Sequence, residues 1–381
     1  MSNNNNLIDV IKPVYVTEPF LPPLEEFQEY LREIWENKWL TNNGQFHREF
    51  EQKLCEFLGV PYVSLFANGT LALITALQAL RITGEVITTP FSFVATAHAL
   101  HWNGIKPVFC DIEQAHCTID PDKIEPLITP ATSAILPVHV YGHPCNVDAI
   151  QDIADMYGLK VIYDAAHAFG VRVNGTSICN FGDLSVLSFH ATKVLTTFEG
   201  GAIICHNEKM KKRIDYLKNF GIAGETTVVG PGINAKMNEF QAALGLLQLK
   251  YHENNRNKRQ RNTNIYKEYL NGIDGIRYLD EMNNTYHNYA YFPIFVQDDY
   301  SLTRDELYTK MKQNNIHLRR YFYPLISEFP TYRSLQSSVS ADLKTAKRIS
   351  EQVLCLPISP NIDVEDIEFI VSLLRSDVSN I

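Results

Sequence analysis

Short apolar runs, rich in β-branched and aromatic residues, alternate with segments of helical spacing over residues 13–250. Runs of this kind are typical of strands buried on both faces of a parallel sheet, and the segments between them are long enough for crossover helices. This order predicts a doubly wound α/β sheet with right-handed crossovers. We expect its strands at Tyr62–Phe66, Glu85–Pro90, Lys106–Ile112, Ala134–Gly142, Leu159–Asp164, Leu184–Phe189 and Ala202–Cys205.

Helices are expected where apolar residues recur every three or four positions. Acidic residues early in Leu24–Asn37 suit the positive end of a helix dipole. We expect residues 1–12 to form a frayed tail and Gly221–Gly232 to form a mobile segment. The other expected helices are Phe46–Leu58, one that follows Thr70, Val94–Trp102, Val147–Tyr157, Lys209–Lys218 and a long polar helix from Gln248 to about Leu270.

The pattern changes after the long polar helix. Strands are expected near Tyr289–Val296, followed by a helix over Leu302–Asn314. The basic and aromatic stretch Leu318–Leu325 is open to two interpretations, a strand with a solvated basic face or a surface that contacts substrate. We therefore divide the chain into a large domain at residues 1–250, with an N-terminal arm at residues 1–23, and a small C-terminal domain at residues 251–381.

Composition narrows the class of protein. Of 381 residues, 45% are hydrophobic and 20% are charged, as in ordinary soluble globular proteins. The net charge of −9 argues against partners such as nucleic acid or an anionic membrane. No run reaches the ~18 apolar residues of a membrane span, and the asparagine-rich start is unlike a signal peptide. The seven cysteines include no Cys-x-x-Cys pair, so we expect reduced packing residues in a cytoplasmic protein and no bound metal.

The candidate chemistry lies in one stretch, Val161–Cys205. Its first predicted strand ends on Asp164, and its second ends near Ser188, before a polar loop that contains Lys193. Catalytic side chains in open α/β sheets lie just past the carboxyl ends of strands. A lysine taken at random is most often a solvated surface residue. Beside an aspartate and a double glycine, this lysine is instead typical of a site that attaches pyridoxal phosphate, with the carboxylate facing the ring nitrogen.

The turn Ala67–Thr70 is a second candidate site, because it links a predicted strand directly to a helix. A small-residue turn of this kind leaves free backbone N–H groups and the positive end of the helix dipole, which together suit a phosphate. The alternative is a plain N-cap, in which Asn68 or Thr70 caps a structural helix. The motif alone favours the plain cap.

Three motifs of this chain occur together: Asp164-Ala165-Ala166-His167, Ser188-Phe189-His190-Ala191-Thr192-Lys193 and Glu199-Gly200-Gly201. In combination, they resemble the nucleotide-sugar aminotransferases of the DegT/DnrJ/EryC1/StrS family. The resemblance extends from near Pro13 to about residue 325. It implies a pyridoxal-phosphate-dependent enzyme of aminotransferase fold type I: a mostly parallel seven-stranded sheet flanked by helices, with a smaller C-terminal α/β domain. It also implies a homodimer with shared active sites.

The resemblance also implies roles for individual residues. Lys193 and Asp164 would be catalytic, and His167 would contact the ring hydroxyl of the cofactor, where many relatives have glutamine. Phe93, rather than Phe91, would stack on the cofactor ring. The phosphate would be bound by Gly69, Thr70, Ser188 and Asn234 of the partner subunit. The substrate would be contacted by Asn43, Lys236, Arg320 and Tyr321, although Lys236 stands where arginine is common, which leaves its role open.

The implied reaction transfers an amino group from L-glutamate to a dTDP-linked keto sugar, dTDP-4-keto-6-deoxy-D-glucose, with pyridoxamine phosphate as the intermediate form of the cofactor. The product would serve O-antigen or another surface polysaccharide. Relatives that dehydrate the sugar have histidine at the lysine position, so Lys193 favours transamination.

Three alternatives stay open. The first is amination at C3 of a 3-keto isomer. The second is a pyridoxal-phosphate lyase or desulfurase, which would need a catalytic cysteine on a mobile loop, and the third is a sensor that binds sugar nucleotides without catalysis.

Overall fold

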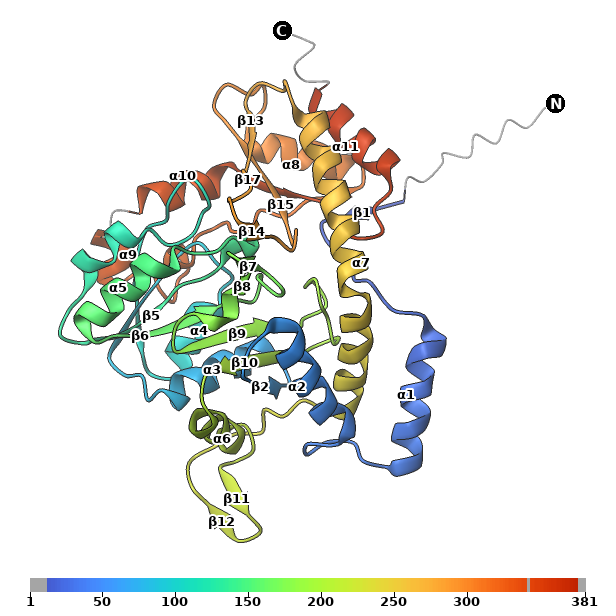
Figure 1. Ribbon diagram of the computed structural model, residues 1–381. Helices are drawn as coiled ribbons and strands as arrows, with labels where there is room; N and C mark the ends of the chain where they lie inside the picture. The colour runs from blue at the N-terminus through green and yellow to red at the C-terminus, as the bar shows by residue number, and fades with distance from the viewer. Residues whose placement is uncertain (1–11, 341–342, 376–381) are drawn as a thin grey trace.

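A seven-stranded sheet forms the centre of the computed structural model, which describes residues 12–340 and 343–375 (Figure 1). Within this sheet, β10 runs antiparallel to both of its neighbours and the remaining pairs are parallel. The prediction of a mostly parallel seven-stranded sheet is therefore confirmed. In spatial order the strands are β2 (Tyr62–Phe66), β10 (Gly201–Cys205), β9 (Leu184–Ser188), β6 (Lys160–Asp164), β5 (Thr132–Leu136), β3 (Glu85–Thr88) and β4 (Lys106–Phe109).

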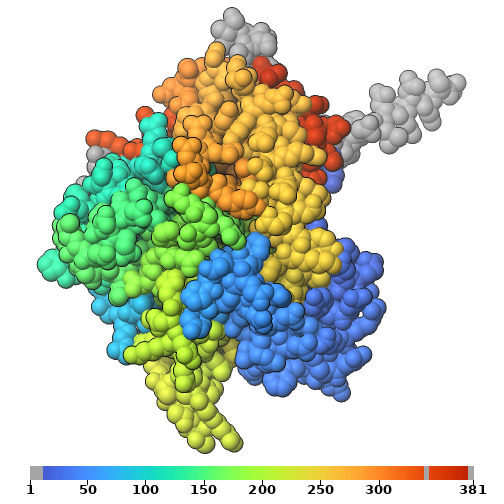
Figure 2. Space-filling model, in the orientation of Figure 1, coloured from blue at the N-terminus to red at the C-terminus, as the bar shows by residue number. Residues whose placement is uncertain are grey.

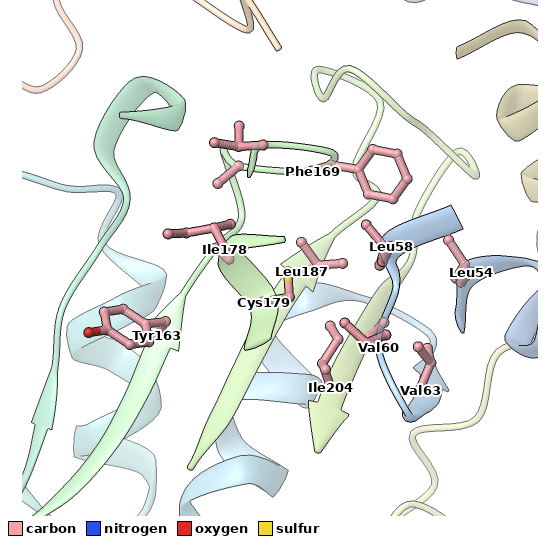
Figure 3. Close-up of a cluster of buried hydrophobic side chains, with 14 of the residues drawn as sticks. Leu54, Leu58, Val60, Val63, Tyr163, Phe169, Ile178, Cys179, Leu187 and Ile204 are labelled. Atoms are coloured by element: carbon pink, nitrogen blue, oxygen red, sulfur yellow. The ribbon is translucent and has the colours of Figure 1, made fainter. Parts of the chain in front are cut away.

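Helices cover both faces of this sheet, as the alternation of side chains along its strands requires. In β10, Ile204 joins a core that includes Leu54 and Leu58 of α2 (Gln45–Leu58), shown in Figure 3. Its neighbour Ile203 points to the other face and joins the core under α3 (Gly69–Ala79). The other helices around the sheet are α4 (Ala95–Trp102), α5 (Val147–Tyr157) and α6 (Glu208–Leu217), while α1 (Leu24–Asn37) packs against α7 (Glu239–Leu270) (Figure 1).

Helix α7 spans Glu239–Leu270 without a break and runs from the sheet to the C-terminal part of the chain (Figure 1). The expected start at Gln248 is wrong: the helix begins at Glu239, where Asn238 and Gln241 form a capping box. Apolar residues on every side of its first turns hide the helical period that amphipathic segments show. The expected domain boundary at residues 250 and 251 falls within this helix, so both parts of the chain share it.

The C-terminal part packs helices against a second, antiparallel sheet. The arm before α1 reaches this part, because β1 (Val14–Tyr15) pairs with β16 (Ile316–His317). The strand considered for Leu318–Leu325 does not form; one bridge joins Arg319 to Cys355 and the rest is irregular. The elements are β13 (Ile276–Tyr278), β15 (Phe292–Val296), β17 (Val353–Leu356), α8 (Arg304–Gln313), α9 (Gln336–Ser340), α10 (Lys344–Gln352) and α11 (Val364–Arg375).

Two small sheets complete the fold. The segment expected to be mobile, Gly221–Gly232, contains a hairpin of β11 (Ile222–Gly224) and β12 (Thr227–Val228), which projects from the body of the molecule (Figure 2). The other small sheet joins β7 (Arg172–Val173), β8 (Thr176–Ser177) and β14 (Thr285–Tyr286). The expected tail lies outside the described residues except for residue 12. In the part of the chain that the structure describes, no helix combines the length and apolar character of a bilayer span.

Candidate active site

A cavity of about 210 Å³ opens where β6 and β9 end, beside the first turn of α3. These two strands are parallel neighbours, with Asp164 opposite Val186, so their carboxyl ends meet at one edge of the sheet. Loops that follow adjacent parallel strands therefore face the same space. Eight of the twelve residues predicted for the site line this cavity: Gly69, Thr70, Phe93, Asp164, His167, Ser188, Lys193 and Tyr321.

Lys193 lies in the polar loop after β9, and its side chain faces the cavity. Burial lowers the pKa of its ammonium group to about 8, and the Asp164 carboxylate opposes this shift. The Nζ atom donates a long hydrogen bond of 3.4 Å to the hydroxyl of Tyr291. With this pKa, a fraction of the molecules carries the free amine near neutral pH, which is the form that attacks a carbonyl carbon.

Asp164 is the last residue of β6 and is buried. One carboxylate oxygen accepts a hydrogen bond from the hydroxyl of Thr96 at 2.8 Å, and the other accepts one from the Ala166 N–H at 3.1 Å. Burial raises the pKa of Asp164, while the two donors and Lys193 lower it. Its carboxylate is thus oriented by fixed donors and faces the cavity, where a protonated ring nitrogen would complete the pairing.

The turn at the start of α3 combines both features that the sequence left open. The side chain of Asn68 accepts from the Leu71 N–H at 2.9 Å, so the plain N-cap is present. Gly69 and Thr70 come before Leu71 in the same first turn, and their N–H groups lie beside the cavity. A Cβ on Gly69 would lie 3.0 Å from Ser188 Cβ, so glycine lets the helix start against this serine. The turn can therefore contain both the N-cap and a binding site for a phosphate.

His167 forms part of the cavity wall and is held as a neutral ring. Its Nδ1 atom accepts a hydrogen bond from the Tyr141 N–H at 3.2 Å, which leaves the proton on Nε2. Burial and the charge of Lys193 lower its pKa well below the ordinary value. The ring stacks on Phe322 with a centroid distance of 5.7 Å and an interplanar angle of 5°. This arrangement leaves Nε2–H as a donor, as a contact with a ring hydroxyl would require.

Two predicted substrate residues, Asn43 and Lys236, lie outside the cavity of the single chain. Asn43 belongs to the loop before α2, and its carbonyl accepts from Arg48 at 2.6 Å. Lys236 donates to the side chains of Asn219 and Asn234 at 2.8 and 2.7 Å. Asn234 likewise lies outside this cavity, as a residue that acts on the partner's cofactor would. Their roles stay predictions.

Arg320 also lies outside the cavity, although its neighbour Tyr321 lines it. Its guanidinium donates to Asp305 at 2.8 Å and lies 4.6 Å from the centre of the Tyr308 ring. The expected contact between Arg320 and substrate also stays a prediction, because the side chain points to these partners in the single chain.

The sequence did not indicate two residues that directly contact the predicted catalytic residues, Lys193 and Asp164. Thr96 hydrogen-bonds Asp164 from the first turn of α4, and Tyr291 reaches Lys193 from the segment before β15. Thr96 lies three residues after Phe93, so its place near the sheet edge could have been inferred from the strand before it. Tyr291 comes from the C-terminal part of the chain, and no local pattern indicates that it reaches the loop of Lys193.

The donor set fits pyridoxal phosphate. A lysine with a lowered pKa faces the cavity together with a buried carboxylate, a neutral histidine donor and a helix start opposite a serine hydroxyl. This fold and cavity define a pyridoxal-phosphate-dependent enzyme of the fold type I class. Among the described residues that line the cavity there is no cysteine, and the described cysteines are free thiols.

Comparison with known proteins specifies the class further. The model of the DegT/DnrJ/EryC1/StrS aminotransferase family matches residues 24–375, which extends the resemblance beyond residue 325. The chain is 54% identical over 364 residues to the dTDP-4-amino-4,6-dideoxy-D-glucose transaminase of Shigella dysenteriae, covering 96% of this chain and 99% of the relative.

Solved structures of related proteins share this fold. DesI, crystallised with its TDP-sugar product, superposes with a TM-score of 0.92 at 34% identity, covering 97% of this chain and 93% of DesI. NtdA from Bacillus subtilis, with bound cofactor PMP, has a TM-score of 0.86 at 30% identity over 94% of this chain and 82% of its own. This chain belongs to the DegT/DnrJ/EryC1/StrS aminotransferase family and is a pyridoxal-phosphate-dependent aminotransferase.

Proposed function

We propose that this enzyme transfers the amino group of L-glutamate to C4 of dTDP-4-keto-6-deoxy-D-glucose and forms dTDP-4-amino-4,6-dideoxy-D-glucose. The observation that supports this most is the placement of Lys193 and Asp164 in one cavity, in a chain that aligns almost end to end with a transaminase of that name. We further propose that the reaction takes place in the cytoplasm and supplies O-antigen or another surface polysaccharide, as the family resemblance implies.

Lys193 performs two tasks in this proposal. Its amine would hold the cofactor, and burial prepares this amine by lowering its pKa to about 8. As a free amine it lies beside Asp164 and Tyr291, where it would move a proton as a general base. A base with a pKa near the working pH combines a sizeable unprotonated fraction with useful basicity, which favours both directions of proton transfer.

Asp164 and His167 would hold the cofactor ring from two sides. When bound, pyridoxal phosphate supplies an electron sink that stabilises negative charge at the carbon that loses its proton. The Asp164 carboxylate would keep the ring nitrogen protonated, and the Thr96 hydroxyl and Ala166 N–H fix that carboxylate in place. The Nε2–H of His167 would donate to the ring hydroxyl. Phe93 lines the cavity and would stack on the ring face.

The phosphate would lie at the first turn of α3, against Gly69, Thr70 and Ser188. We propose that Asn234 of the partner subunit completes this site in a homodimer. Exposed apolar residues near the projecting hairpin support such an interface, because Phe220, Val228 and Val229 are 50%, 68% and 57% exposed in the single chain.

A mixing experiment tests the shared site. Lys193→Ala and Asn234→Ala subunits should each be inactive or impaired as homodimers. Co-expressed and purified as a heterodimer with two different tags, they should regain up to half of the wild-type activity, because one of the two sites then has both native residues. Heterodimers as inactive as their parents would contradict the shared site.

Absorbance spectroscopy tests the half-reaction with the amino donor. The purified enzyme should absorb visible light when loaded with pyridoxal phosphate, and L-glutamate should remove this band while 2-oxoglutarate appears. A band that L-glutamate leaves unchanged over many minutes would contradict glutamate as the donor, and a panel of other amino acids would then identify it.

The ring carbon is decided by product analysis. The enzyme, with L-glutamate, is incubated separately with the 4-keto sugar nucleotide and its 3-keto isomer, and the amino sugar is identified by NMR. We expect product from the 4-keto substrate. Faster turnover of the 3-keto isomer would overturn the C4 assignment and leave the transaminase assignment intact.

A further inference from the structure

One side chain at the start of α7 joins two of the segments that contribute to the cavity wall. The side-chain Nε2 of Gln241 donates to the carbonyl of Glu199 at 2.5 Å and to the carbonyl of Ala67 at 3.3 Å. Ala67 is the first residue of the turn that leads into α3, and Glu199 lies near the end of the loop that contains Lys193. Gln241 itself does not line the cavity.

The other end of this side chain is fixed by the capping box of α7. The Asn238 N–H donates to Gln241 Oε1 at 3.2 Å, and the Gln241 N–H donates to the side chain of Asn238 at 2.9 Å. Because the oxygen of the amide accepts from Asn238, its NH₂ group must face the two carbonyls. A glutamate could form the same capping box, but it has no proton to donate to the carbonyls of Ala67 and Glu199.

The turn before α3 and the end of the loop that contains Lys193 are packed closely, so displacement of one would move the other. The N–H of Ala67 donates to the carbonyl of Ala235 at 2.8 Å, before α7, while the carbonyl of Ala67 accepts from Gln241 in the first turn of α7. Both main-chain groups of Ala67 are therefore held from this part of the chain. A Cβ added to Gly201 would lie 2.8 Å from the main-chain carbon of Asn68 and from the nitrogen of Gly69. Such contacts leave no free space between the end of the lysine loop and the start of α3.

We propose that Gln241 is a positioning residue for the cofactor site, which sets the spacing between the anion-binding turn of α3 and the loop of Lys193. Both segments must bind the same molecule of pyridoxal phosphate, one through its phosphate at Gly69 and Thr70 and the other through its aldehyde carbon at Lys193. The inference rests on the cofactor placement proposed above. It adds a role for a side chain that touches neither the cofactor nor the substrate.

Gln241→Glu is the decisive variant, because it keeps the capping box and exchanges the donor for an oxygen that repels both carbonyls. Glutamate fills this position in the capping box of α8, where Glu306 accepts from Thr303, so the helix start should form. Losing two hydrogen bonds to the main chain should raise the dissociation constant of pyridoxal phosphate for the apo-protein about tenfold or more. Gln241→Ala, without the repulsion, should raise it about fivefold.

Gln248→Glu is the matched control, since it makes the same change on the same helix. Gln248 is buried and donates to the carbonyl of Phe20 at 2.6 Å, away from the cavity. The Gln248→Glu variant should lower the thermal midpoint of the apo-protein and leave the dissociation constant of pyridoxal phosphate within about twofold of the wild type. Saturating cofactor should restore most of the turnover of Gln241→Glu, which separates lost positioning from lost chemistry.

A dissociation constant for Gln241→Glu within about twofold of the wild type would overturn the proposal, as would an equal rise in Gln248→Glu. If Gln241→Glu does not fold, the same criterion applies to Gln241→Ala. Failure of the wild-type protein to bind pyridoxal phosphate would instead overturn the cofactor placement, so the two failures are distinguishable.

Discussion

The inner end of the cavity and its rim are built in different ways. At the inner end, Asp164 and Ser188 are the last residues of adjacent parallel strands, so the hydrogen-bonded sheet fixes where their side chains start. We call the three predicted substrate residues outside the cavity, Asn43, Lys236 and Arg320, its proposed rim. They lie outside the helices and strands, and each has contacts elsewhere.

The difference shows which parts of an active site one chain can define. The main chain at this edge of the sheet has one arrangement, because β6 and β9 are each paired on both sides and packed on both faces. A rim residue such as Arg320 can exchange one partner for another at small energetic expense, since exposed ion pairs contribute little. Variants at the inner end should therefore affect catalysis much more than variants at the rim.

The largest effect is expected for Lys193→Ala. Removing the amine removes both the attachment point and the base, so the rate of amino-sugar formation should fall by at least about ten-thousandfold. Chromatography of the product measures the rate, and the visible absorbance of the purified protein should change at the same time. Lys209→Ala, which alters an exposed lysine on α6, is the control and should retain wild-type turnover. Turnover of the Lys193 variant within tenfold of the control would show that another group is the nucleophile.

Asp164→Asn should have the next largest effect. It preserves the size of the side chain but removes the charge that keeps the ring nitrogen protonated, so kcat should fall about a hundredfold to a thousandfold. The pH dependence gives a second readout on the apo-protein. The Asp164 carboxylate raises the pKa of Lys193, which burial lowers to about 8, so the asparagine variant should bring that pKa below 8.

Labelling of Lys193 with an amine reagent, followed by mass spectrometry, measures this shift. Only the unprotonated amine reacts, so reactivity rises with pH and its midpoint equals the pKa. In Asp164→Asn the midpoint should move to lower pH than in the wild type. A midpoint that moves to higher pH would mean that the carboxylate does not stabilise the ammonium form.

The inner end could be predicted from the sequence because it depends on strand ends. Apolar runs locate the strands, and Asp164 at the end of one strand and Lys193 in the loop after another are then expected at one edge of the sheet. The start of α7 was not predictable in this way. Its first turns are apolar on all sides, and the contacts of Gln241 join segments that lie 42 and 174 residues away in the chain. Tyr291 was missed for the same reason, since it contacts a residue 98 positions away.

Tyr291→Phe tests a residue that lies between the two regions. The hydroxyl accepts a hydrogen bond from Lys193, and its loss should lower kcat about threefold to tenfold, because the released amine then has one partner fewer. An acceptor stabilises the charged form of the amine, so its removal should also move the labelling midpoint of Lys193 to lower pH. Tyr289→Phe, two residues before it and outside the cavity, is the control. Equal kinetics for both variants would mean that the contact with Lys193 has no role in turnover.

The smallest effect is expected for Arg320→Ala. This variant tests whether Arg320 keeps the contacts of the single chain when the substrate binds. In the single chain, the guanidinium of Arg320 is bound to Asp305 and lies over Tyr308, outside the cavity. If this arrangement also holds with substrate bound, contrary to the contact that the family resemblance implies, the KM for the sugar nucleotide should change by less than about threefold. Steady-state kinetics at saturating L-glutamate measures this value, and Asp305→Asn, which releases the arginine, is the companion variant. A rise of tenfold or more in Arg320→Ala would mean that the side chain leaves Asp305 to bind substrate. The rim would then depend on the ligand, in contrast to the inner end, whose geometry the sheet sets beforehand.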